Sequence, residues 1–409
     1  MASQLPRPTG KLETYPSPRY FRSLSVGPGA PDKFEDYLQG DEPQIALRVV
    51  NFKDGTLVSL VFLHTLSDMM GFASLLKAWS LAVGGKLDQV PPFLGFRDDP
   101  MAGLYEAEPS KPYLLADRQL SGWRLFVWGI RFLIESWWCP PLESRTICFP
   151  EELVLALRKT AKNDLIQSAG QGNKEVPFIS DGDIITALVT RMACEELKKP
   201  SSRSVTTILG VDSRTRAPSI FRQDAAYVQN AAVGAFSFDT ASEILRKPLG
   251  LLALKYRNDL IAQLELDQVI GLCRLNRQNL QKTGNAVMFG DTSTVLAVVS
   301  SWSKARCFDI VNFRPAIIPP PDRETSREGS LEKGGNYGHP AYWHLQALGT
   351  PRFSPTIFGV IGRDAKGNMW LTGDLRPSVW PVFKGYMNKI LLESNALIEQ
   401  HSSSDDLKK

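Results

Sequence analysis

The sequence lacks the features that mark secreted and metal-binding proteins. The first twenty residues are rich in proline and polar side chains and have no apolar core, so we expect no signal peptide. The five cysteines are odd in number, far apart and free of any C-x-x-C spacing: Cys139, Cys148, Cys194, Cys273 and Cys307. This pattern predicts reduced thiols, mostly in the core, in a cytoplasmic protein.

Long runs of one charge are also missing. The net charge of the 409 residues is only +4, which disfavours nucleic acid as a partner, although a local basic pocket for a phosphorylated cofactor is compatible with it. An apolar content of 43% with 22% charged residues is typical of globular proteins. A chain of this length suits two domains of roughly 150 to 200 residues each.

No apolar run is long enough to cross a bilayer. The nearest approach is the segment 122–138, which contains the charged residues Arg124, Arg131 and Glu135 and is shorter than the ~20 residues that a membrane span requires. We interpret it as an amphipathic crossover helix between domains. A membrane-surface anchor is the alternative.

What the sequence does contain is a histidine at the end of a strand. Residues 44–52 and 56–63 predict a hairpin around the turn at 53–55, and its second strand is so apolar that we expect it to be buried on both faces. His64 ends this strand, and an apolar helical pattern follows over 72–83. An imidazole there is a candidate general base. Asp68 lies among apolar neighbours and therefore requires a partner, which we expect to be an arginine.

Strands and helices alternate through the rest of the chain, which predicts mixed α/β layers. The segment 205–218 is expected to be a strand ending in charge, with Arg214 and Arg216 on one face. Further strands are expected at 145–149, from 227, at 294–302, 356–362 and 369–372, and helices at 151–162, 184–192, 241–264 (broken at Pro248) and 379–399.

Several motifs resemble those of one enzyme family in both content and order. His64-x-x-x-Asp68 with Gly71 resembles the HxxxD(G) signature of the BAHD-type acyl-CoA-dependent acyltransferases, especially their fungal secondary-metabolite, trichothecene-acetyltransferase-like branch. The other matches are Asp183–Leu188 ("DALTAL"), Asp212–Pro218 ("(N/D)xRxRxxP", with one spacer fewer), Tyr227–Asn230 ("YxGN"), Ser300–Trp302 ("TSW") and Asp309–Pro315 ("DFGWGxP").

The resemblance implies an α/β fold of the two-domain chloramphenicol-acetyltransferase-like architecture, with mixed sheets flanked by helices and a channel between the domains. We expect an N-terminal domain over 1–142 and a C-terminal domain over 143–409, with a segment near 300–320 returning to the first domain. The implied protein is a cytoplasmic monomer without a membrane span. It takes acyl-CoA and a small-molecule acceptor, has no metal and keeps no permanently bound cofactor.

The resemblance also implies roles for individual residues. His64 would be the general base in acyl transfer from acyl-CoA to a hydroxyl or amine of a small secondary metabolite, without a covalent acyl-enzyme. Ser300 would donate to the oxyanion, and Trp302 would supply an indole N–H or a wall. Asp68 would pair with Arg214 by preference and with Arg216 second. The residues Tyr227 and Asn230 would line the acceptor pocket or close a turn.

Three departures from the family pattern qualify this expectation. Only 63 residues precede His64, where the family usually has many more, so N-terminal strands are expected to be absent. In the late motif, Val311 and Phe313 stand where glycines are expected, and Gln229 replaces the glycine of "YxGN". One alternative is therefore an inactive, truncated relative that acts as a binding protein.

Other chemistries are less compatible with the sequence. A condensation-domain relative acting on carrier proteins normally has a doubled histidine, whereas Leu63 precedes His64. A metal site would recruit His339 and His344, whose spacing matches no common zinc pattern. An α/β-hydrolase needs G-x-S-x-G, which does not occur in the chain.

Overall fold

The structure is a computed structural model. It describes residues 5–6, 9–17, 21–31, 33–53, 55–169, 175–195, 202–317, 337–345 and 353–406, with the backbone alone for 395–406.

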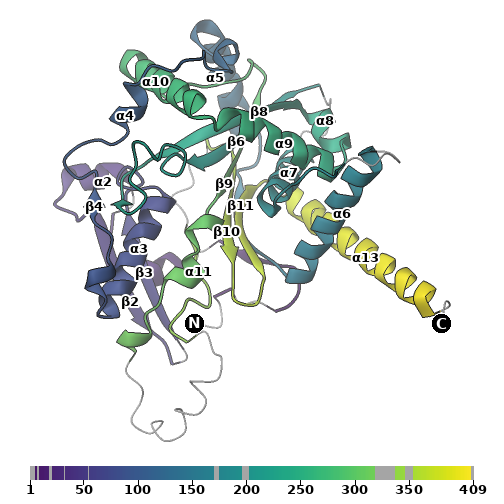
Figure 1. The fold of residues 1–409 in the computed structure, drawn as a ribbon, viewed down its shortest axis with the longest axis horizontal. Helices are drawn as coiled ribbons and strands as arrows, with labels where there is room; N and C mark the ends of the chain where they lie inside the picture. The colour runs from purple at the N-terminus through teal and green to yellow at the C-terminus, as the bar shows by residue number, and fades with distance from the viewer. Residues whose placement is uncertain are drawn as a thin grey trace, which may run out of the picture.

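A seven-stranded mixed sheet forms the centre of the molecule (Figure 1). Its spatial order is β1 (Glu13–Pro16), β5 (Glu143–Phe149), β11 (Met369–Leu375), β10 (Thr356–Arg363), β9 (Val295–Ser301), β6 (Ser204–Asp212) and β8 (Ala232–Thr240). Strand β9 runs parallel to both β10 and β6, and the other neighbours are antiparallel. The predicted α/β class with a mixed sheet is confirmed.

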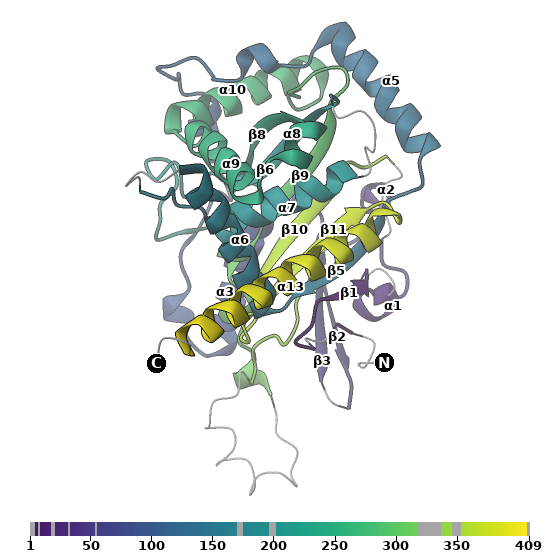
Figure 2. The ribbon, with the colours of Figure 1, turned by 90° about the vertical axis from the view of Figure 1, so that its right-hand side faces the viewer.

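Helices cover one face of this sheet (Figure 2). They are α6 (Glu151–Ala169), α7 (Asp181–Glu195), α8 (Ala241–Arg246), α9 (Leu249–Gln263) and α13 (Val379–Asp406). The apolar side chains of alternate strand positions, such as Ile147, Val299 and Phe358, pack against these helices in the main core. The break predicted at Pro248 separates α8 from α9, because proline cannot donate the helical hydrogen bond.

The remaining elements lie around the other face and the ends of the sheet. The strands are β2 (Ile45–Asn51), β3 (Thr56–Phe62), β4 (Phe93–Leu94) and β7 (Ala226–Tyr227). The helices are α1 (Arg22–Ser25), α2 (Phe34–Gln39), α3 (Met69–Val83), α4 (Ala102–Tyr105), α5 (Gly122–Trp138), α10 (Leu266–Thr283) and α11 (Cys307–Ile310), with short 3-10 turns at Leu87–Gln89, Ala116–Arg118, Ser303–Ala305 and Arg314–Ala316.

Helix α3 packs against the segment that follows β9. Met69, Phe72 and Leu76 of α3 share an apolar cluster with Cys307 and Val311. The partly buried side chains of this cluster include Leu60 and Phe62 of β3, together with Trp302 and Phe313. Parts of the chain that lie more than 200 residues apart are thus joined by one apolar cluster.

Two expectations about strands were wrong. Strand β3 is not buried on both faces: among the described strands it pairs with β2 alone, in a separate two-stranded sheet, and Val58 is exposed. The predicted strand over 205–218 ends at Asp212, and residues 214–216 form a turn. Arg214 and Arg216 therefore do not share a face of an extended chain.

All five cysteines are free thiols, and four of them are buried: Cys148, Cys194, Cys273 and Cys307. Within the described ranges, no helix has the length and apolar character needed to cross a membrane. The same residues contain no group of three or more His, Cys, Asp or Glu side chains arranged to hold a metal ion.

Candidate active site

His64 lies in an exposed turn between β3 and α3. The turn is closed by a hydrogen bond from the Leu66 N–H to the Leu63 carbonyl at 2.9 Å. The His64 side chain is exposed, and it has no hydrogen-bond partner within the part of the chain that the structure describes. The imidazole is therefore open to a substrate and is not part of a packed core.

The backbone of this turn is fixed by Asn230. The Asn230 side-chain amide donates to the carbonyl of His64 at 2.7 Å and to that of Thr65 at 3.2 Å. Asn230 belongs to the segment between β7 and β8, far from His64 in sequence. This contact makes Asn230 a positioning residue for the turn that carries the imidazole.

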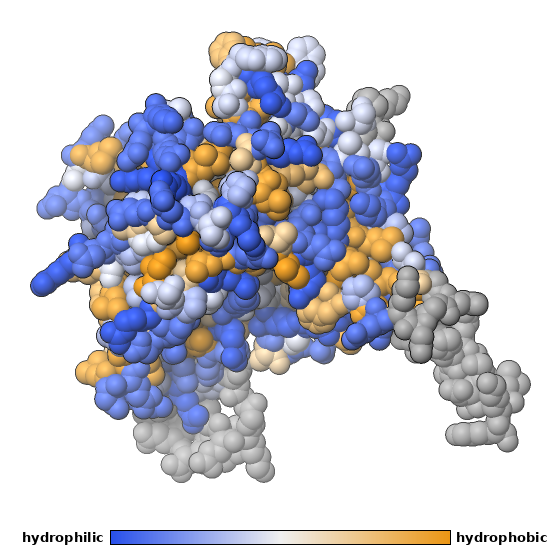
Figure 3. Space-filling view, turned by 45° about the horizontal axis from the view of Figure 1, so that its top comes forward, coloured by the Kyte–Doolittle hydropathy of each residue, from blue (hydrophilic) through white to orange (hydrophobic). Residues whose placement is uncertain are grey.

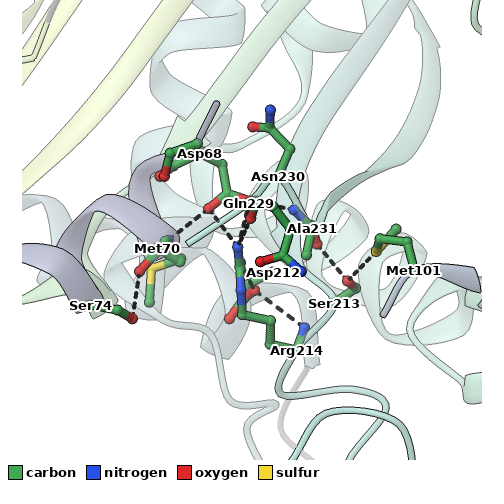
Figure 4. A network of polar contacts seen from close by, with 12 residues as sticks. Asp68, Met70, Ser74, Met101, Asp212, Ser213, Arg214, Gln229, Asn230 and Ala231 are labelled. Atoms are coloured by element: carbon green, nitrogen blue, oxygen red, sulfur yellow. Dashed lines mark hydrogen bonds and ion pairs between the residues drawn. The ribbon is translucent and has the colours of Figure 1, made fainter. Parts of the chain in front are cut away.

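Asp68 is the N-cap of α3 and the centre of a buried polar network (Figure 4). Its Oδ1 accepts from the Gly71 N–H at 2.9 Å, and its Oδ2 accepts from the Ala231 N–H at 2.7 Å. The Arg214 Nη2 donates to Oδ1 at 3.1 Å and to Oδ2 at 3.2 Å. Asp68 is 6% exposed and Arg214 is 8% exposed, so the ion pair is desolvated and requires these further hydrogen bonds.

Arg214 connects this network to the large sheet. It donates to Asp212 Oδ1 at 2.7 Å, at the end of β6, and to the Gln229 carbonyl. The structure thus brings Asp68 and Arg214 together, as expected. Arg216 makes no such contact: its Nε is buried without a partner among the described residues, and its backbone N–H donates to the Ser213 carbonyl.

Gly71 occupies a position where no side chain fits. A Cβ atom there would lie 2.1 Å from the Val228 carbonyl oxygen, well inside van der Waals contact. The first turn of α3 therefore lies directly on the chain at 228–231, where Asp68 binds Ala231. Asp68 and Gly71 together dock the His64 turn onto the segment that precedes β8.

A comparable close approach involves Gln229, the residue that replaces the expected glycine. Its side-chain amide lies over Gly95, where a Cβ atom would come within 2.2 Å of Gln229 Nε2. Gly95 has a φ of +79°, which favours glycine. Gly95 was not among the residues predicted for the site, although its place between an apolar pair and Phe96 indicates a turn.

Tyr227 is buried in a core cluster. Its ring packs edge-on against Phe221 at a centroid distance of 5.2 Å, and its hydroxyl accepts from the Arg222 N–H at 2.9 Å. Of the two roles expected for Tyr227, this geometry favours the closing of a turn.

Ser300 and Trp302 form the end of β9 as one unit. The Trp302 indole N–H donates to Ser300 Oγ at 2.8 Å, which leaves the Ser300 hydroxyl hydrogen free to be donated elsewhere. Since the indole N–H is bound to Ser300 and not free for an oxyanion, Trp302 orients the Ser300 hydroxyl in this structure.

Glycines flank Ser300 on both neighbouring strands. Gly210 of β6 and Gly359 of β10 are in register with Ser300. A Cβ atom at Gly210 would lie 3.2 Å from Ser300 Oγ, and one at Gly359 would lie 2.7 Å from the Trp302 ring. Both glycines make room for the pair. Neither was predicted for the site, although an isolated glycine in an apolar strand indicates a close approach of this kind.

The two halves of the site meet at one edge of the sheet. Strands β6 and β9 are parallel neighbours, so their C-terminal ends, which lead to Arg214 and to Trp302, lie at the same edge. Arg214 holds Asp68, and the apolar cluster joins Trp302 to β3 and α3 on either side of His64. The exposed imidazole and the Ser300 hydroxyl are thus carried by elements that pack together.

The late motif serves this packing. Val311 is buried in the cluster with α3, and the Phe313 ring lies 4.7 Å from that of Trp79. Asp309 is exposed and pairs with Arg306, while Pro315 lies in the turn Arg314–Ala316. Apolar side chains at the expected glycine positions thus attach the segment to α3.

Comparisons with known proteins agree with these motifs. The chain is 33% identical over 398 residues to acetyltransferase sphE of Aspergillus fumigatus, covering 95% of this chain and 76% of that protein. It is 32% identical over 400 residues to O-acetyltransferase PaAT-2 of Phomopsis amygdali, covering 95% and 79%. No family model matches the chain.

A solved structure shares the fold. It is that of TRI101 from F. sporotrichioides in complex with coenzyme A and T-2, with a TM-score of 0.58 and 16% identity over 84% of this chain and 68% of that one. With its identity to sphE and PaAT-2 over nearly its whole length, the chain belongs to their family of fungal acetyltransferases, and its HxxxD(G) motif, docked by Arg214, resembles that of the BAHD-type acyl-CoA-dependent acyltransferases.

Proposed function

We propose that this protein transfers an acyl group from acyl-CoA to a hydroxyl group of a small secondary metabolite, with His64 as the general base. The observation that carries the proposal is the exposed imidazole on a turn whose backbone is held by Asn230 and docked by Asp68. A base that is held in place and left uncovered can accept a proton from a bound hydroxyl.

The reaction is a direct transfer in two balanced steps. As the acceptor oxygen attacks the thioester carbonyl, its proton passes to His64, and the negative charge develops on the carbonyl oxygen. Collapse of this tetrahedral intermediate breaks the carbon–sulfur bond, and the CoA thiolate leaves and takes the proton from His64. No covalent acyl-enzyme forms, and no metal or permanently bound cofactor takes part.

Ser300 is the proposed donor to the oxyanion. Its oxygen accepts from the Trp302 indole N–H at 2.8 Å. The hydroxyl hydrogen therefore points away from the indole and is available for donation to the oxyanion. An oriented hydroxyl stabilises the oxyanion more than a freely rotating one does, because it needs no reorganisation when the negative charge develops. Trp302 therefore acts on the reaction through Ser300, as a positioning residue.

The acceptor is proposed to be a hydroxylated small molecule. The relatives sphE and PaAT-2 are named as acetyltransferases, the second as an O-acetyltransferase, and the TRI101 structure contains coenzyme A together with T-2. An acetyl group and an oxygen acceptor are therefore the first pair to test. We also propose that the enzyme acts as a cytoplasmic monomer.

The test is acceptor-dependent release of CoA. Purified protein is incubated with acetyl-CoA and a panel of hydroxylated terpenoid and polyketide acceptors, while free thiol and the acetylated product are measured together. We expect equal amounts of both, and we expect the intact mass of protein incubated with acetyl-CoA alone to be unchanged. A stable acetyl adduct on the protein would contradict direct transfer, and thiol release without product would contradict the assigned activity.

A further inference from the structure

Helix α5 exposes a continuous apolar stripe. Seven large side chains follow one another at steps of three, four or one residues, which places them on one side of the helix. Their exposed fractions range from 43% to 82%: Trp123, Phe126, Ile130, Leu133, Ile134, Trp137 and Trp138. No residue of α5 is buried. So many exposed apolar side chains on one helix mark an interaction surface.

The other side of α5 is fastened to the body by polar contacts. The Trp128 indole donates to the Thr294 carbonyl at 3.0 Å, and Arg131 donates to the Thr292 carbonyl at 3.2 Å. Glu135 accepts from Arg203 at 2.6 Å. The orientation of the helix is thereby fixed, with its apolar stripe facing away from the sheet.

The position of α5 leaves the stripe accessible. The helix stands at the periphery of the molecule, away from the layers around the sheet (Figures 1 and 2). A space-filling view with the top of the molecule brought forward shows apolar side chains at the surface among polar ones (Figure 3).

The charges of α5 are complementary to an anionic surface. The helix carries two arginines, Arg124 and Arg131, both exposed, and a single acid. That acid, Glu135, is neutralised by Arg203. Both arginines lie at the flank of the stripe nearest the body, where Arg131 binds the Thr292 carbonyl and Arg124 interacts with Asp291, so the exposed positive charge is confined to that flank.

We propose that α5 binds the interface of a phospholipid bilayer with anionic headgroups. A helix of 17 residues is about 25 Å long, so it can lie in the plane of the membrane. Tryptophans at both ends of the stripe, Trp123 at one end and Trp137 and Trp138 at the other, are the side chains that favour the headgroup region. Arginine beside them adds attraction to anionic lipid. The acyltransferase would thus work at a membrane surface, where apolar acceptors collect.

Vesicle co-sedimentation of the full chain tests this proposal. The protein is mixed with vesicles of phosphatidylcholine alone or with added phosphatidylserine. A triple variant, Phe126→Gln, Ile130→Gln and Leu133→Gln, removes three exposed side chains of the stripe while keeping good helix formers. The matched control is Leu38→Gln, Leu155→Gln and Leu392→Gln, which removes three equally exposed leucines from α2, α6 and α13.

We expect the parent and the control to bind phosphatidylserine vesicles and the triple variant to bind at least roughly tenfold more weakly. Arg124→Gln should reduce the preference for phosphatidylserine. The melting temperature and the CoA release with a water-soluble acceptor should be the same in all variants, because α5 lies outside the proposed site. This keeps the outcome separate from that of the proposed function.

Three results would overturn the proposal. The first is a parent protein that binds neither type of vesicle, and the second is a triple variant that binds as well as the parent. The third is light scattering that finds a dimer of the parent and a monomer of the triple variant without vesicle binding, which would make a second copy of the chain the occupant of the stripe.

Discussion

At the scale of single residues, the site depends on how Asp68 is used. Each carboxylate oxygen accepts one backbone N–H and one contact from Arg214. The four contacts of Asp68 are therefore structural, and none of them involves the His64 ring. Its role is to hold the first turn of α3 against the chain at 228–231.

Replacing Asp68 by asparagine should therefore destabilise the fold as well as the activity. Whichever way the new amide is turned, its NH2 group faces a backbone N–H donor, and Arg214 loses one of its two acidic partners and keeps only Asp212. Breaking a buried pair in this way costs about 3–5 kcal/mol. Chemical denaturation should show this loss. Asp224→Asn, which removes the partner of exposed Arg222, is the control and should leave stability unchanged.

A variant Asp68→Asn that is as stable as the parent but has lost all activity would contradict this role. In that case the aspartate would orient the imidazole directly.

Gly71→Ala tests the close approach of α3 to Val228. The added methyl group would need the space of the Val228 carbonyl, so the helix must shift, with a loss of about 1–3 kcal/mol and lower activity. Gly385→Ala is the matched change, because Gly385 also lies in a helix but has nothing within 4 Å of the added atom. It should stabilise the protein by up to about 1 kcal/mol. Equal melting temperatures for the two variants would contradict the predicted clash.

At the scale of elements, the end of β9 is expected to supply the oxyanion donor. Ser300→Ala should lower kcat by about 10²-fold, since it removes a donor from the developing charge. Trp302→Phe keeps an aromatic ring at this position but loses the N–H to Ser300 and the edge of the indole that lies over Gly359, so its effect on kcat should be smaller than that of Ser300→Ala but in the same direction. Steady-state kinetics with acetyl-CoA measures both.

The neighbour Ser301 provides the control for this pair. It is exposed, and its hydroxyl donates only to Ser303 at 3.4 Å, so Ser301→Ala should keep the parent's kcat. If Ser300→Ala also keeps it, the assignment of the oxyanion donor is wrong.

The elements also show how far sequence reasoning can reach. The hairpin before His64, the helix α5 and the break at Pro248 were predicted, because turn residues, apolar periodicity and proline act locally. The prediction that β3 is buried on both faces was wrong, because the apolar sequence of a strand does not reveal which other strands lie beside it. Helix α10 was not predicted, since its sequence is largely polar. Residues 214–216 were placed in a strand because a turn without glycine or proline has little local signal.

Contacts between distant segments were the least predictable part of the site. The partner of Asp68 was expected from the family's motif, whereas its hydrogen bonds from Gly71 and Ala231 come from backbone geometry that no pattern displays. The role of Gly210 and Gly359 beside Ser300 can be recognised only when the register of the three strands is known.

At the scale of the whole molecule, the division into domains at 1–142 and 143–409 stays a prediction. The packing of Ala305, Cys307 and Val311 on α3 supports the expected return of the segment near 300–320 to the N-terminal part of the chain.

The burial of the thiols gives a prediction for the whole molecule. Burial raises the pKa of Cys148, Cys194, Cys273 and Cys307 to about 12, so these side chains are neutral as well as inaccessible at ordinary pH. Titration with Ellman's reagent at pH 8 should therefore detect only the half-buried Cys139 in the native protein and all five thiols in denaturant. Rapid reaction of a second thiol in the native state would show that the core opens.

The most direct test of the account is the rate of acyl transfer by His64→Ala. The side chain is exposed and makes no hydrogen bond to the described residues, so its removal should leave the melting temperature unchanged. Loss of a positioned general base should lower kcat/KM by about 10²- to 10⁴-fold. A stable variant that still transfers acetyl groups at the parent's rate would contradict the claim that this imidazole carries the chemistry.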